Sequence, residues 1–150
     1  MKRAGEDPAE HDRFESVGAA NDGFVQIGEL PVPAVAAVRG AAVGAGVNLL
    51  LATGLRIVAE DARIIGGFPR IGIHPGGVHF TLLGRLVGRE TAAAIGVFGE
   101  ETSGSRAHEL HLEWEAVPDG DVEPRAVELA RRAAADPALP RRTVGRIPTR

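Results

Sequence analysis

The order of apolar and polar positions predicts an α/β chain in which short buried strands alternate with helices. Ala34–Val38 is an almost unbroken aliphatic run, which is typical of a strand buried on both faces. A stretch of glycines and other small residues follows this run. The apolar run from about Gly46 then has the composition of a helix, and Gly54 is a suitable residue to end it. Leu55–Ala59 and Ala62–Ile65 then read as two further strands.

The second half of the chain predicts mainly helices. The expected elements are helices at about His79–Leu86, Arg89–Val97 and Ser105–Leu110, a strand at Glu113–Val117 and an amphipathic helix at Val122–Ala135. In the last helix we expect Val127, Ala130 and Ala134 to face the core. Trp114 and Val117 are predicted to be core residues.

Composition limits the classes of partner and compartment. The chain has 150 residues with 44% hydrophobic and 25% charged, which is typical of one globular domain. A net charge of −3 gives no reason to expect nucleic acid, and no apolar run is long enough to predict a membrane span. The absence of cysteine fits a cytoplasmic protein. We expect a polar, disordered tail over residues 1–23, a folded core over 24–138 and a C-terminal tail over 139–150.

The glycine-rich stretch GAAVGAG precedes the first predicted helix. Gly44 and Gly46 let the backbone turn tightly, which leaves the amides near Ala45 at a helix N-terminus. Such an end can bind an anion or an oxygen on which negative charge grows. The alternative is a turn that needs glycine only for packing. The stretch matches neither the dinucleotide fingerprint nor the P-loop.

Three consecutive blocks of sequence carry a resemblance to a known family. They read PVPAVAAVRGAAVGAGVNLLLATGLRIVAEDARI, FPRIGIHPGG and LVGRETAAAIGVFGEETSGSRAHELHLEWEAVP, and they run from about Leu30 to Pro118. In this order they resemble the central part of the crotonase superfamily, the enoyl-CoA hydratases and isomerases. The resemblance implies a spiral of ββα turns. The N-terminal part is incomplete here, because nothing resembles the family's first oxyanion loop.

The resemblance also implies a site for a coenzyme A thioester. The family holds the thioester oxygen on two backbone amides, and one of them corresponds to Ala45. The residues implied around the substrate are Ala42, Gly44, Gly46, Pro69, Gly76 and Gly77. Coenzyme A enters as part of the substrate, so no separate cofactor and no metal are expected.

Two glutamates that handle water in the family are replaced here. Asn48 stands at the first position, and an amide cannot act as a general base. Arg70 stands at the second and stays protonated. Asn48 either hydrogen-bonds a water, an acyl group or the loop opposite, or it bonds its own backbone. Arg70 either clamps an anionic group of the substrate or forms a surface or inter-subunit ion pair.

The histidines offer further candidates for acid–base chemistry. His74 lies in the Gly/Pro loop and could supply the missing acid or base, or simply face solvent. His79 departs from a family glycine, and we expect it to cap the next helix. His108 and His111 are three residues apart rather than four and have no third ligand nearby, so we expect no metal site there.

Two functions therefore remain open. The first is an enoyl-CoA hydratase/isomerase-like enzyme that stabilises an enolate through the amide of Ala45, with hydration itself not expected because both glutamates are replaced. The catalytic candidates are Ala45, Asn48, Arg70 and His74. The second is a catalytically inactive or truncated relative that binds acyl-CoA or a partner subunit. The resemblance implies a homo-oligomer, a trimer in the family.

Overall fold

The computed structural model describes residues 23–75, 77–136 and 138. Residues 23–28 are helical. The strands are β1 (Val35–Val38), β2 (Ala41–Val43), β3 (Leu55–Ala59), β4 (Arg63–Ile65), β5 (Glu101–Ser103) and β6 (Glu115–Val117). The helices are α2 (Ala45–Leu51), α3 (Gly77–Gly96), α4 (Gly104–Glu109) and α5 (Val122–Ala134), with 3₁₀ turns η1 (Phe68–Ile71) and η2 (Asp119–Asp121). The two predicted tails lie outside the described residues, except for Gly23.

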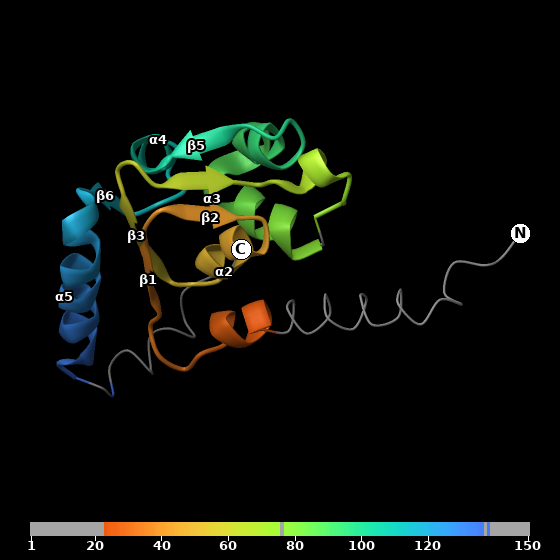
Figure 1. Cartoon of the computed structure of the whole chain (residues 1–150). Coiled ribbons are helices and arrows are strands. Elements are labelled where there is room, and N and C mark those ends of the chain that lie inside the picture. The colour runs from red at the N-terminus through yellow and green to blue at the C-terminus, as the bar shows by residue number, and fades with distance from the viewer. Residues whose placement is uncertain (1–22, 76, 137, 139–150) are drawn as a thin grey trace, which may run out of the picture.

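The strands form two three-stranded sheets. One sheet has the order β1-β3-β6 and is parallel throughout, with Val35 opposite Leu55. The other has the order β2-β4-β5, in which β2 and β4 are parallel and β5 is antiparallel. The chain gives one strand to each sheet and then a helix, first as β1-β2-α2 and again as β3-β4-α3 (Figure 1). This alternation is the ββα spiral that the resemblance implies.

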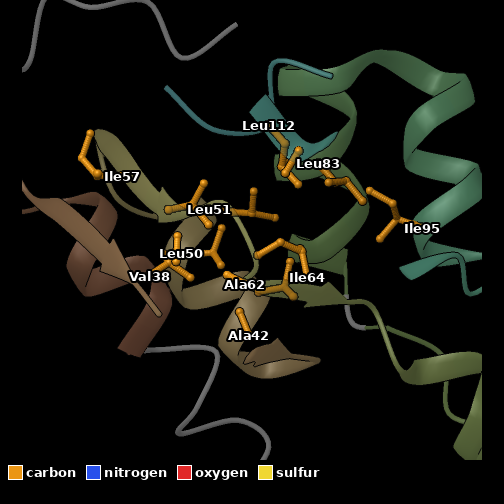
Figure 2. Packing of buried hydrophobic residues seen from close by; sticks show 14 of the residues in the cluster. Val38, Ala42, Leu50, Leu51, Ile57, Ala62, Ile64, Leu83, Ile95 and Leu112 are labelled. Carbon is orange, nitrogen blue, oxygen red and sulfur yellow. The ribbon is translucent and has the colours of Figure 1, made fainter. Parts of the chain in front are cut away.

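The core is one cluster in which residues of α2, α3, α4 and α5 pack with strands of both sheets. Leu50 and Leu51 of α2 lie close to Val38 of β1, and Leu83 of α3 lies close to Leu112 (Figure 2). The residues of β3 from Arg56 to Ala59 are buried, as expected for the middle strand of a parallel sheet. This packing fixes α2, and with it the glycine turn that precedes the helix.

Short strands were the elements that the sequence did not reveal. The structure has β2 inside the predicted glycine turn and β5 in a predicted loop. Each has only three residues, so side-chain alternation gives little signal. The two helices predicted either side of Gly88 are confirmed, because Gly88 (φ 74°, ψ 175°) breaks the helical path inside α3.

Two predictions about the core were wrong. Trp114 is 60% exposed, because it lies in the bend that leads into β6. The amphipathic helix is present as α5, but its buried face was misplaced. Val122 and Ala126 face the core with Leu129 packed beside them, whereas Val127 is exposed. Spacings of four and three residues define this face, which lies about one residue away from the predicted one.

Candidate functional site

The turn before α2 has the geometry that the glycine pattern predicts. Gly44 has φ 53° and ψ −110°, a conformation that L side chains rarely adopt. Its N–H donates to the carbonyl oxygen of Ile65 at 2.9 Å, and its own carbonyl accepts from Val47 at 3.0 Å and Asn48 at 3.4 Å. This arrangement ties the turn to β4 and starts α2 at Ala45.

The amides of Ala45 and Gly46 are left without a carbonyl partner. Within the part of the chain that the structure describes, no backbone oxygen accepts from either N–H. Ala45 is exposed and does not have a positive φ, so the turn accommodates its methyl group. The first turn of α2 therefore has two N–H groups without a backbone acceptor among the described residues, at the positive end of the helix.

Asn48 points into the protein rather than toward its own backbone. Its Oδ1 lies 2.6 Å from Nδ1 of His79 in α3, and Asn48 is only 5% exposed. Of the alternatives for Asn48, the structure therefore shows a contact with the segment opposite α2. Position 48 carries an amide held by an imidazole.

His79 is fully buried among aromatic rings. Its ring centroid lies 5.0 Å from that of Phe68 and 5.6 Å from that of Phe80, both edge-on. Burial lowers the pKa of His79 below its usual value, so the ring is neutral near pH 7. Sequence reasoning gave His79 only a capping role. The sequence did carry one signal for a site role of His79: this histidine replaces a family glycine next to the predicted loop.

Phe68 connects the histidine to the glycine turn. A Cβ built on Gly44 would lie 3.8 Å from the Phe68 ring, so η1 packs directly against the turn. The structure thus brings together Gly44, Ala45 and Asn48 on one side with Phe68 and His79 on the other.

Arg70 takes part in an ion-pair cluster on the surface. It contacts Glu101, which also accepts from Nη2 of Arg63 at 2.7 Å. The hydrogen bond from Arg63 and the nearby Arg70 hold the pKa of Glu101 below its usual range. The structure therefore gives Arg70 a protein partner from β5.

The remaining predicted positions are spread around this region. His74 is exposed, with its ring centroid 6.1 Å from that of Phe80. Ala42 is buried in β2, Pro69 is exposed in η1, and Gly77 begins α3. Gly76 lies outside the described residues. An open hollow of about 440 Å³ lies on α3 and is lined by Phe80, Gly84, Arg89, Ala92, Ala93 and Val97, none of them predicted site residues.

The histidines of the AHELH run have no companion ligands. His108 contacts the carbonyl oxygen of Glu113 at 3.3 Å, and the described residues contain no group of three side chains that could hold a metal ion. No helix in the described ranges has the length and apolar character needed to cross a bilayer.

Comparison with known proteins identifies the family. The sequence model of the enoyl-CoA hydratase/isomerase family matches residues 2–145. A probable enoyl-CoA hydratase of Rhodobacter capsulatus is 42% identical over 109 residues, which cover 70% of this chain and 42% of that protein. The 1,2-epoxyphenylacetyl-CoA isomerase of Escherichia coli is 34% identical over 76% of this chain and 44% of its own length. The chain thus spans less than half the length of these curated relatives.

Solved structures agree with this result. The crystal structure of an enoyl-CoA hydratase from Bacillus anthracis has a TM-score of 0.80 and 31% identity, covering 89% of this chain and 51% of that one. Pseudomonas aeruginosa DspI, at 24% identity, shows the same fold with a TM-score of 0.85, covering 94% of this chain and 53% of its own. The chain therefore belongs to the enoyl-CoA hydratase/isomerase family, within the crotonase superfamily.

Proposed function

We propose that this chain binds an acyl-CoA thioester and holds the thioester oxygen on the N–H of Ala45. The observation that carries this proposal is the amide at the first residue of α2, which has no backbone acceptor among the described residues and belongs to an exposed residue. In that place a backbone donor stabilises the negative charge that develops on the oxygen when an enolate forms. Family membership supports the thioester as the ligand.

The residues around this amide favour an enolate step other than hydration. Asn48 and Arg70 cannot take a proton, and Arg70 is already engaged by Glu101. We assign the proton transfer that such a step needs to His74, which is exposed in the loop before α3. Isomerisation or decarboxylation of the acyl group needs no activated water and therefore fits this set better. One curated relative is named as an isomerase.

A second candidate is a protein that binds acyl-CoA or a partner subunit without turning over substrate. It is favoured by the protein partners that Asn48 and Arg70 already have. Both candidates share the binding step, and they differ in whether bound crotonyl-CoA or another acyl-CoA is converted.

Replacing Ala45 with proline tests the binding step. Proline has no N–H, and it is well tolerated at the first position of a helix, so Ala45→Pro removes the donor while keeping α2. We expect acetoacetyl-CoA to bind wild type more tightly than free coenzyme A does, and Ala45→Pro to weaken that binding about tenfold. Calorimetric titration measures both affinities. Any turnover should fall at least a hundredfold, as for loss of one oxyanion donor.

Ala45→Ser is the matched control, because it changes the side chain and keeps the N–H. It should bind acetoacetyl-CoA as wild type does. Equal affinity of wild type and Ala45→Pro would show that this amide does not contact the ligand. Crotonyl-CoA absorbance then separates the two candidates: thioester binding with no change in absorbance excludes hydratase activity.

We also propose that the chain acts as a cytoplasmic homo-oligomer. The family resemblance and the absence of cysteine support this proposal. Exposed apolar side chains on two neighbouring segments give it a physical basis.

A further inference from the structure

His79 carries a polar atom that the fold leaves without a partner. Among the described residues, three fully buried side-chain atoms lack a hydrogen bond: Nε2 of His79 and both carboxylate oxygens of Glu113. His79 is 0% exposed and is held by Phe68 and Phe80. A buried histidine that uses only one nitrogen needs an explanation.

The single hydrogen bond of His79 determines where its proton lies. Nδ1 faces Oδ1 of Asn48 at 2.6 Å, and an amide oxygen can only accept a hydrogen bond. A neutral imidazole has one N–H, so this contact places the proton on Nδ1. Nε2 then carries a lone pair and faces Gly96, where a built Cβ would lie 3.4 Å away. The ring atom left without a hydrogen-bond partner is therefore an acceptor, Nε2, and not an N–H donor.

The same hydrogen bond fixes the orientation of the Asn48 amide. With Oδ1 engaged by His79, the amino group Nδ2 has no hydrogen bond within the described residues. Nδ2 is not among the fully buried unpaired atoms of the described residues. Asn48 lies three residues after Ala45 on the same helical face, and helical side chains lean toward the N-terminus.

We propose that His79 is a positioning residue that holds the amide of Asn48 so that its Nδ2 donates to the acyl-CoA thioester beside the N–H of Ala45. This inference rests on the proposed function and specifies its chemistry. Asn48 then supplies a second donor on the ligand's oxygen side, where the family has a carboxylate. The site selects an acyl group that presents a negatively charged or strongly accepting oxygen, such as a thioester enolate.

Imidazole ¹⁵N NMR tests the positioning directly, without any ligand. Long-range ¹H–¹⁵N spectra distinguish the two neutral tautomers, and His79→Asn identifies the His79 signals among the five histidines. We expect His79 to be neutral at pH 7 with its proton on Nδ1. In Asn48→Ala the acceptor is gone, and the proton should move largely to Nε2. A proton on Nε2 in the wild-type chain would overturn the proposal, because Oδ1 of Asn48 would then face the site.

Binding of acetoacetyl-CoA tests the consequence for the ligand. Asn48→Ala and His79→Leu should each weaken binding about tenfold, and the double variant should be no weaker than either one. His79→Asn is the conservative variant, because its amide can donate from the position of Nδ1. It should stay within about threefold of wild type. Normal binding by His79→Leu, or losses that multiply in the double variant, would overturn the proposal.

The two experiments separate this inference from the proposed function. A wild-type chain that binds no acetoacetyl-CoA but has the Nδ1 proton refutes the thioester ligand and leaves the positioning by His79 supported. A chain that binds the thioester with its proton on Nε2 refutes the positioning alone. If His79→Leu does not fold, the tautomers of wild type and Asn48→Ala still decide the positioning.

Discussion

A buried ion pair shows how single residues set the response of this chain to pH. Glu113 has a fully buried side chain whose Oε2 lies 3.4 Å from Nε of Arg56. Arg56 donates to the carbonyl oxygens of Leu112 at 2.8 Å and Thr53 at 3.0 Å, so its cation is well satisfied. The carboxylate has no such donors, and burial raises the pKa of Glu113 to about 7 despite the arginine.

We predict that Glu113 makes the folded chain less stable as pH rises. Its pKa is near 4.5 when unfolded and about 7 when folded, so the folded chain binds the proton more tightly between these values. The associated stability is present in full below about pH 4.5 and is lost as pH rises through 7. The loss is about 3 kcal/mol. Urea unfolding of wild type and Glu113→Gln at pH 5 and pH 8 measures the change.

The comparison with Glu113→Gln is necessary because His79 acts in the opposite direction. Its lowered pKa means that stability is lost as pH falls below 6.5. This contribution cancels between wild type and variant. Glu115→Gln, two residues along and partly exposed, is the control and should leave the pH dependence close to that of wild type. Parallel pH curves for wild type and Glu113→Gln would contradict the prediction.

At the level of elements, Gly104 marks a close approach between the two sheets. Gly104 begins α4, and its N–H donates to the carbonyl oxygen of Ala62 at 2.8 Å. A Cβ at this position would lie 1.9 Å from the carbonyl oxygen of Ala59, which belongs to the middle strand of the parallel sheet. Only glycine lets β5 and α4 pass so near β3.

We predict that Gly104→Ala destabilises the chain by about 3 kcal/mol, because backbone rather than a flexible side chain must move. This loss corresponds to a fall in Tm of about 10 °C. Gly84→Ala is the matched control. It lies within α3, has open space where a Cβ would be, and should raise stability by about 0.5–1 kcal/mol through helix propensity. Equal effects of the two substitutions would contradict this account.

The elements themselves could largely be read from the sequence, whereas their faces could not. Long apolar runs such as β3 and the glycine that precedes Ala45 give local signals, so both were predicted. The buried face of α5 depends on which strands it meets, and sequence periodicity left an error of one residue. Asn48 was predicted as a site residue, but its partner His79 lies 31 positions away and only tertiary packing brings them together.

At the level of the whole molecule, two neighbouring segments expose large apolar side chains. Gly99 lies near Pro69 and Arg70 pairs with Glu101, so η1 and the segment after α3 lie side by side. These two segments carry Ile71 at 68% exposed, Val97 at 56% and Phe98 at 78%, which we call the η1–α3 patch. Exposed apolar groups of this size are typical of protein–protein contacts.

We predict that the chain self-associates through the η1–α3 patch, because pairing two copies removes this surface from water. Sedimentation equilibrium of wild type should show an oligomer, and Phe98→Asp should shift it toward monomer because a buried unpaired charge is costly. Trp114→Asp is the matched control: Trp114 is another exposed aromatic residue, 60% exposed against 78% for Phe98, in the segment before β6. Association should survive in that variant. A wild-type chain that stays monomeric at high concentration, or association lost in Trp114→Asp and kept in Phe98→Asp, would rule out the patch.

Since Ala45, Asn48 and His79 lie outside the patch, monomeric Phe98→Asp should also keep its affinity for acetoacetyl-CoA.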